Sequence, residues 1–241
     1  GKSEVRSYKN QAGNRGIELG GWSYGAQFGD LNNDGAQDLY VANGYISGKK
    51  GTSYWYDYSK ITGANKQIIS DAKNWPAMDG RSQSGFQRNR IWLNDGQGYF
   101  QEVAAMVGGE DPMDSRAVAF ADLWNRGVLD VIVANQSGEL MVYKNNVTGD
   151  HHWIGFELQG AASNRSAIGA TITLQSENSR QSRVITGGIG YCSQNQRRTY
   201  FGLGEHPEVE NVTIRWPSGT IQELRDYRID TLHTVTEPLP S

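Results

Sequence analysis

The first half of the chain alternates short apolar runs with polar turns rich in Gly, Asn and Asp. Short apolar or alternating runs bounded by such turns are typical of β-strands, whereas helices show longer stretches with a 3.6-residue period. Strands are therefore predicted at residues 22–29 and 38–43. Residues 88–103 place two further alternating arms around an Asn-Asp-Gly-Gln-Gly turn, which predicts a β-hairpin.

After residue 150 the chain becomes a series of short strand-like segments separated by tight turns. Seven such segments predict a small β-sandwich or barrel. We therefore divide the chain into residues 1–148 and 149–241. The strands predicted in the second part are residues 152–158, 170–174, 183–186, 199–203, 209–216, 221–224 and 232–236.

The first part contains an internal repeat. Residues 26–43 align with residues 118–135 at an offset of 92, with nine identities in 18 positions that fall on turn and core residues. Residues 139–145 follow the second copy as residues 91–94 follow the first. Without the inserted segment, the repeating unit has about the size of one four-stranded propeller blade. The fold class expected is therefore all-β, with about two blades of a partial β-propeller and then the sandwich or barrel.

The turn between the first two predicted strands has the composition of a Ca²⁺ loop. Oxygen-bearing groups occupy every second position, a glycine supplies the sharp turn, and hard oxygen ligands are those that Ca²⁺ selects. Strands rather than helices flank the loop, and no Glu stands at its twelfth position, so it is not an EF-hand. The alternative is a polar Asn/Asp/Gly turn without a metal. The predicted ligands are Asp30, Asn32, Asp34, the carbonyl of Ala36, and Asp38.

The second copy of this loop keeps the outer carboxylates, Asp122 and Asp130, but replaces the inner ligands by Trp124 and Arg126. Our hypothesis is that the Arg126 guanidinium takes the place of the cation and pairs with both carboxylates. The second loop is then predicted to be free of metal.

Residues 44–85 interrupt the repeat with a segment that is rich in Gly, Ser, Lys and aromatic residues and shows no clear periodicity. Long insertions of this kind often carry function, although their aromatic residues also serve to pack an insertion onto its scaffold. If the protein is an enzyme, this segment is the expected lid, but its acidic residues Asp57, Asp71 and Asp79 show no paired spacing.

The composition excludes several classes of protein. Of 241 residues, 23 are Lys or Arg and 26 are Asp or Glu, so the net charge of −3 gives no reason to expect a nucleic-acid partner. No apolar run reaches the length of a membrane span. The single cysteine, Cys192, excludes an internal disulfide and is expected to pack as a small apolar side chain.

Two groups of motifs resemble known families. The Phe-Gly-Asp-x-Asn-x-Asp-Gly-x-x-Asp block at residues 28–38 and the hairpin at residues 89–100 resemble FG-GAP/VCBS repeats, which form propeller blades. The second part is similar to the ASPIC/UnbV domain, and together the combination resembles cartilage acidic protein-like proteins and their bacterial relatives. The ASPIC/UnbV-like residues are 163–170, 187–194, 201–204 and 216–219.

This resemblance implies a secreted, extracellular or periplasmic location, Ca²⁺ held at the first loop, and no established enzymatic chemistry. A full propeller has more than two blades, so the chain is expected to be the C-terminal fragment of a longer protein or a subunit of an extracellular assembly joined through blade edges.

No arrangement of residues in the sequence indicates catalysis. The histidines are scattered, and neighbours such as His151 and His152 at a strand start point to opposite faces, which argues against a shared metal. His206 precedes Pro207 in an expected turn. Residues 187–194 are glycine-rich and polar and lie beside Arg197 and Arg198, so they suit either a sugar or an acidic peptide, or simply link two sheets as a bent strand. Asn-x-Ser/Thr sequons occur at Asn135, Asn146, Asn164 and Asn211.

The expected function is thus a Ca²⁺-binding structural and interaction module with a protein or glycan partner and no catalytic residues. The alternative is a Ca²⁺-dependent enzyme that acts on a polysaccharide or a secondary metabolite, with residues 44–85 as its lid.

Overall fold

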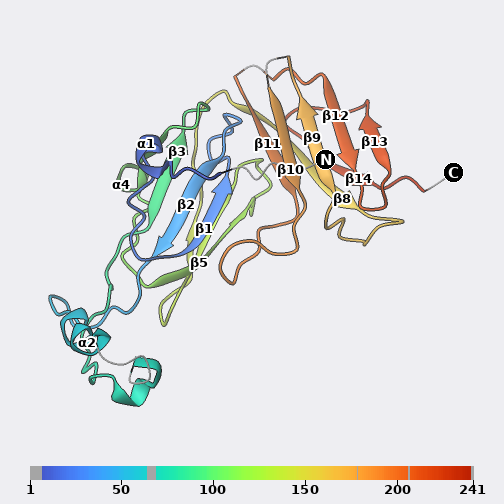
Figure 1. Ribbon diagram of the computed structural model, residues 1–241. Coiled ribbons are helices and arrows are strands. Elements are labelled where there is room, and N and C mark those ends of the chain that lie inside the picture. Colours follow the sequence, from blue (N-terminus) through green and yellow to red (C-terminus); the bar gives the residue numbers. More distant parts are fainter. Residues whose placement is uncertain (1–6, 64–68, 178, 206, 240–241) are drawn as a thin grey trace.

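The computed structural model of the chain describes residues 7–63, 69–177, 179–205 and 207–239. It consists almost wholly of β-strands, which form two groups that lie side by side, with a small helical arm extending from the first (Figure 1). The all-β fold class is therefore confirmed. His206 lies outside the described residues.

The first group contains two antiparallel meanders, in which each strand pairs with the next one along the chain. One meander has the order β1-β2-β3-β4 and the other has the order β5-β6-β7. Their strands are β1 (Ser23–Gly29), β2 (Asp38–Asn43), β3 (Arg90–Asn94), β4 (Phe100–Glu102), β5 (Ser115–Ala121), β6 (Asp130–Asn135) and β7 (Met141–Tyr143).

The sequence repeat is also a structural repeat. Gly29 pairs with Asp38 at the end of the β1–β2 ladder, and Ala121 pairs with Asp130 at the equivalent end of the β5–β6 ladder. Both ladders also have an irregularity near the start of their first strand. Matching register at matching residues means that both loops are held by the same pair of strand ends.

The two meanders pack against each other through one apolar cluster. Tyr40, Val118, Phe120 and Val133 are each 0–1% exposed in it. The opposite face of the first sheet is covered as well, because Leu39, Val41 and Trp92 pack against Ile17 and Phe100. This double burial explains why β2 is buried at all six positions and reads as a continuous apolar run.

The second group is a sandwich of two sheets with the orders β10-β9-β12-β13 and β11-β8-β14. All pairs are antiparallel except β14 with β8, which is parallel. The strands are β8 (His152–Gln159), β9 (Thr171–Gln175), β10 (Arg180–Val184), β11 (Thr199–Gly204), β12 (Asn211–Arg215), β13 (Ile221–Leu224) and β14 (Leu232–Thr236).

One core joins the two sheets of the sandwich. Phe156 of β8 and Phe201 of β11 meet edge to face at 6.0 Å, and Ile172, Ile214 and Trp216 close the core from the facing sheet and its end. All seven predicted strands are present, and a sandwich rather than a barrel is formed. The prediction of residues 183–186 for β10 was displaced, because the turn before it closes early through a bond from Ser176 N to Ser179 O.

A buried carboxylate ties the last strand to two turns of the sandwich. Glu237 accepts hydrogen bonds from the backbone N–H groups of Ala161 and Ser163 and from the Ser163 and Ser218 hydroxyls, at 2.6–2.9 Å. Burial alone would raise the pKa of Glu237, but these bonds hold it at about 2. Ser218 is thus a structural turn residue.

The helices are short and lie outside the sheets. The inserted segment, whose sequence shows no clear periodicity, contains α2 and η1 on a stalk that is joined by bridges between Ile46 and Gln83 and between Lys49 and Arg81. The helices are α1 (Ala12–Arg15), α2 (Trp55–Thr62), η1 (Ala72–Asn74) and α4 (Ala104–Val107).

Candidate metal centre

The loop between β1 and β2 carries all five residues that the sequence predicts as Ca²⁺ ligands. Its backbone reverses through two left-handed residues, Asn33 (φ 59°) and Gly35 (φ 90°). Asp30 and Asp38 stand at the ends of the two strands, with exposed fractions of 3% and 0%. The loop therefore buries two carboxylates directly beneath a tight turn.

Both buried carboxylates hold the backbone of the loop. Asp30 accepts the N–H groups of Asp34 (3.1 Å) and Gly35 (2.8 Å). Asp38 accepts the N–H groups of Leu31 (2.8 Å) and Asn94 (2.9 Å), and so also fixes the end of β3. Each carboxylate oxygen that accepts one N–H group keeps a second lone pair.

The second loop repeats this network residue by residue. Asp122 accepts the N–H groups of Arg126 (2.9 Å) and Gly127 (2.7 Å). Asp130 accepts those of Leu123 (3.0 Å) and Asn145 (2.9 Å). The outer carboxylates are therefore part of the fold in both copies, whatever else they bind.

The loops differ at the inner positions. Arg126 donates from Nη2 to Asp130 Oδ1 at 2.6 Å and from Nη1 to the carbonyl of Asn145 at 2.8 Å. The hypothesis that Arg126 pairs with Asp130 is thus confirmed. Asp122 is bonded by the Arg126 backbone instead of the guanidinium, so the expected double pairing was half right. The second loop contains its own cation.

In the first loop, a carboxylate stands where the second has the arginine. Asp34 accepts bonds from Asn32 Nδ2 (2.9 Å) and from the N–H of Ala36 (2.8 Å), and Asn32 Oδ1 accepts the N–H of Asp34. Three carboxylates are therefore close together over nine residues, with no Lys or Arg among them.

Burial, with the neighbouring negative charges, raises the pKa of both Asp30 and Asp38. Burial, and then the charge of Asp34, raise the pKa of Asp30 to about 6. Burial raises the pKa of Asp38 to about 7, and the charges of Asp30 and Asp34 add to this effect against the opposing bonds from Asn94 and Leu31. The loop is thus an unfavourable place for negative charge unless a cation lies nearby.

The donor set fits Ca²⁺ in its chemistry, since it offers three carboxylates, one amide oxygen and the carbonyl of Ala36. Among the described residues, however, no group of three or more His, Cys, Asp or Glu side chains is arranged as a metal site. The carboxylates turn to backbone N–H groups, and it is their second lone pairs that are left for a cation.

The sandwich docks directly on this loop. Gly204 donates its N–H to the Asn33 carbonyl at 2.9 Å, and His151 Nδ1 lies 2.8 Å from the carbonyl of Asn32. A Cβ at Gly202 would lie 2.2 Å from Asp30 Oδ2 and within 2.6 Å of the Asn33 backbone. The Phe-Gly-Leu-Gly motif is therefore glycine-rich because the acidic loop fills the space of a side chain.

The sandwich also brings one arginine close to the loop. Arg183 of β10 lowers the pKa of Asp30 by its charge, and Gln37, with its amide oxygen turned to the guanidinium, accepts from Arg183 Nη2 at 2.8 Å. Within the described part of the chain, no carboxylate oxygen lies within 4.0 Å of the guanidinium nitrogens. Arg183 therefore offsets the negative charge of the loop only in part.

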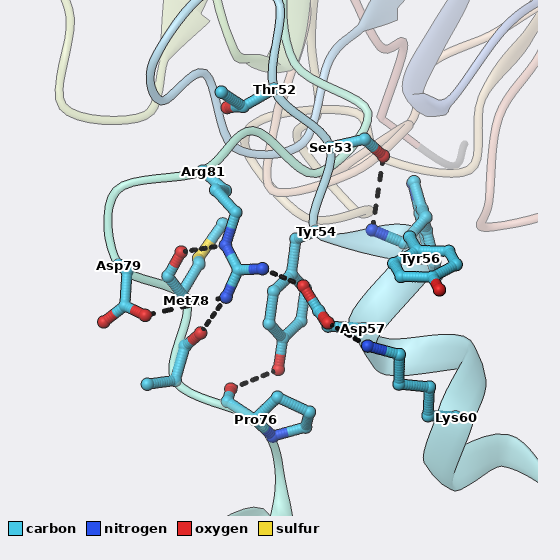
Figure 2. A network of polar contacts seen from close by, with 12 residues as sticks. Thr52, Ser53, Tyr54, Tyr56, Asp57, Lys60, Pro76, Met78, Asp79 and Arg81 are labelled. Carbon is cyan, nitrogen blue, oxygen red and sulfur yellow. Dashed lines mark hydrogen bonds and ion pairs between the residues drawn. The ribbon is translucent and has the colours of Figure 1, made fainter.

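The acidic residues of the inserted arm have structural partners. Figure 2 shows Arg81 between Asp57 and Asp79, with its Nε donating to the Met78 carbonyl at 3.1 Å. Asp57 also pairs with Lys60 at 2.7 Å. Asp71 accepts the N–H of Lys73 and so caps η1. The structure brings these carboxylates to cations and backbone donors, and not to one another.

The aromatic residues of the arm pack mainly on one another and on the body. Trp22, just before β1, stacks on Tyr45 at 5.6 Å and contacts Trp55 at 5.1 Å. Tyr58 meets Trp75 edge to face at 5.1 Å. These contacts confirm the interpretation that the aromatic residues attach the insertion to its scaffold.

Residues 187–194 form a loop that covers β1. The buried Gln27 donates from Nε2 to the Ile189 carbonyl at 2.8 Å, and Gly190 (φ 77°) leaves no room for a Cβ beside that amide. Cys192 is exposed in this loop, so the expectation that it packs inside was wrong. The loop therefore joins the two groups of strands by a local contact.

The two adjacent histidines behave as strand geometry predicts. His151 bonds the first loop, whereas His152 Nδ1 lies 2.7 Å from Asp230 Oδ2. The two side chains therefore have different partners within the described residues.

The comparisons with known proteins bear on the sandwich. Residues 160–240 match the family model described as ASPIC and UnbV. The ASPIC and UnbV match contains β9 to β14 and the glycines that dock on the acidic loop, and it covers 81 of the 241 residues. A comparison with curated proteins finds none that matches the chain. No helix in the described ranges is long and apolar enough to cross a membrane, as expected.

Two residues of the site were not predicted. Asn94, at the end of β3, donates its backbone N–H to Asp38. The equivalent Asn145 after the second copy could have indicated this role, because it donates to Asp130 in the same way. Arg183 gave no signal, because the sandwich fold alone brings it to Asp30.

Proposed function

We propose that this protein is a Ca²⁺-binding structural and interaction module that works outside the cell or in the cell envelope. Its first part consists of two FG-GAP/VCBS-type blades, and its second part is an ASPIC/UnbV-type sandwich that docks on the acidic loop of the first blade. It binds a protein or glycan partner and carries out no chemical transformation.

The contrast between the two loops carries the proposal. Both use two buried aspartates to hold the equivalent backbone N–H groups, so both bury negative charge that needs a nearby positive charge. In the second loop this positive charge comes from Arg126, which bonds the fully buried Asp130. The first has Asp34 at that position, which adds negative charge where positive charge is needed. A bound divalent cation supplies the missing charge.

The residues that hold the ion are Asp30, Asn32, Asp34, the Ala36 carbonyl and Asp38. Calcium contributes positive charge and no chemical step, and its binding free energy adds to the stability of the folded state. Because Asn32 and Asn33 also bond the sandwich through their carbonyls, the ion stabilises the contact between the two parts of the chain.

Assembly through strand edges is a further part of the proposal. The edge strands β4 and β7 have only three residues each, and short edges limit unspecific pairing. Because three residues offer few backbone hydrogen bonds, a partner chain that pairs with β4 or β7 must also make contacts outside these strands.

Calorimetric titration of CaCl₂ into chelator-treated protein tests the metal. We expect binding by the native chain, a marked loss in Asp34→Asn, and no change in the control Asp226→Asn, whose carboxylate is exposed and makes no bond within the described residues. Equal binding by Asp34→Asn and the native chain would move the site elsewhere, and no heat from the native chain would remove Ca²⁺ from the proposal.

A further inference from the structure

A cleft of about 440 Å³ lies where the sandwich meets the first two sheets. Its walls come from β1 and β5 on one side and from β10, β11 and residues 186–198 on the other. We propose that this cleft binds a uronate, a sugar that carries a carboxylate, with Arg183 receiving the acid group. The inference rests on the interaction role proposed above and gives it a ligand class.

The charges of the cleft favour an anion. Three arginines line it, against the single carboxylate of Asp30. Arg198 pairs with Glu157 at 3.4 Å and bonds Asn125, whereas Arg197 has no partner among the described residues other than the Ser166 hydroxyl at 3.1 Å. The cleft thus contains more positive charge than its own acidic group neutralises.

Among the described residues, Arg183 lines the cleft and makes no direct ion pair. Its guanidinium bonds the Ser182 carbonyl and the Gln181 amide oxygen, both at 3.1 Å, and lies over the Phe201 ring at 5.3 Å. These partners, like Gln37, are neutral; burial lowers the pKa of Arg183, and the charge of Asp30 raises it without a direct ion pair in the described part of the chain. A half-buried cation without a direct ion pair is stabilised by an added counter-ion, and a planar guanidinium suits a carboxylate in two parallel hydrogen bonds.

The cleft also offers neutral hydrogen-bonding groups. Within the described residues, the hydroxyls of Thr186 and Thr199, which line the cleft, make no hydrogen bond, and the buried Nε2 of Gln196 has no acceptor. A simple fatty acid would leave these groups unmet. A sugar carries hydroxyl groups that both donate and accept, so it meets them.

An apolar wall completes the match. Phe28, Val184 and Ile189 line the cleft with exposed fractions of 52%, 55% and 39%. The C–H faces of a pyranose ring pack against such a wall, while its hydroxyls and carboxylate point to the polar side. A phosphate ion or a nucleic acid would use the arginines but leave this wall bare.

The test is a calorimetric titration at saturating CaCl₂ with sodium digalacturonate as the probe. We expect binding by the native chain, no binding of the neutral sugar lactose, and none of acetate or phosphate at the same concentration. Arg183→Gln should lose affinity about tenfold or more, as for one charge-assisted pair. The control Arg180→Gln, exposed on the same strand, should bind as the native chain does.

Each outcome bears on the inference. Equal binding of lactose would overturn the role of the charge, equal binding of acetate would overturn the role of the sugar, and no binding of digalacturonate would overturn both. The native chain gives these three results without any variant, so a misfolded Arg183→Gln does not stop the test. The same samples report the Ca²⁺-dependent unfolding temperature, so failure of the metal proposal is seen separately.

Discussion

Asp34→Arg copies the second loop into the first and tests why the two differ. In the second loop the arginine bonds a carboxylate with an exposed fraction of 0%, at 2.6 Å. A hydrogen bond to such a charged group contributes about 1.5–3 kcal/mol. The change also removes the charge that helps to raise the pKa of Asp30. In the presence of chelator, we therefore expect Asp34→Arg to increase the free energy of unfolding by about 1–3 kcal/mol.

The same variant should lose its response to calcium. A ligand at about 100 times its Kd stabilises the native state by about 2.7 kcal/mol. The native chain should gain about that much in excess CaCl₂, whereas Asp34→Arg gains nothing, because the guanidinium occupies the place of the ion. The order of stability of the two proteins therefore changes between chelator and calcium.

Urea unfolding followed by tryptophan fluorescence measures both effects, with Asp226→Arg as a control for the change in net charge. The reasoning is refuted if Asp34→Arg keeps the full calcium increment, or if it is destabilised in chelator by as much as in calcium. The first result would place the ion away from the loop, and the second would show that Asp34 serves the fold itself.

Three further outcomes are expected. In chelator, the free energy of unfolding measured with urea should fall as pH rises from 5 to 8. The folded pKa values of Asp30 (about 6) and Asp38 (about 7) exceed the unfolded value of 3.8, so the folded state binds more protons. Excess CaCl₂ should remove this dependence on pH. Glu237 has the opposite sign: its stabilisation is full above the unfolded value of 4.5 and is lost as pH falls toward 2, so Glu237→Gln should be less stable at pH 7 and show a flatter acid unfolding curve by circular dichroism. Gly202→Ala should cost about 1–3 kcal/mol by urea unfolding, since its Cβ meets the loop backbone, whereas Gly188→Ala, with its nearest atom at 4.0 Å, should cost far less; equal costs would contradict the docking contact.

Much of the fold follows from local pattern. The bounds of β2, β13 and β14 agree with prediction because each is a short apolar or alternating run between turn residues. The repeat also predicted the matching register of the two loops, since Asp38 and Asp130 occupy equivalent places at their strand ends.

The rest depended on contacts that no local pattern contains. α2 was missed because its aromatic residues follow no simple apolar period and are held by rings such as Trp22, outside the segment. Cys192 was misplaced because its loop lies on the surface of β1 rather than inside the sandwich. Arg183 acts on Asp30 by its charge only because the sandwich docks on the loop, so its role depends on tertiary structure.

The parallel pairing of β14 with β8 has a consequence for how the chain folds. Leu232 pairs with Gly155, and Val235 with Leu158, so the last strand of the described chain completes the sheet that the first strand of the sandwich begins. The meanders β1–β4 and β5–β7, by contrast, join neighbours in sequence and close short loops at low entropic cost, apart from the arm. During synthesis, the two meanders can therefore form before β14 is available to complete the sandwich. Premature termination before β14 would release an ordered first half attached to an unfinished, aggregation-prone second half.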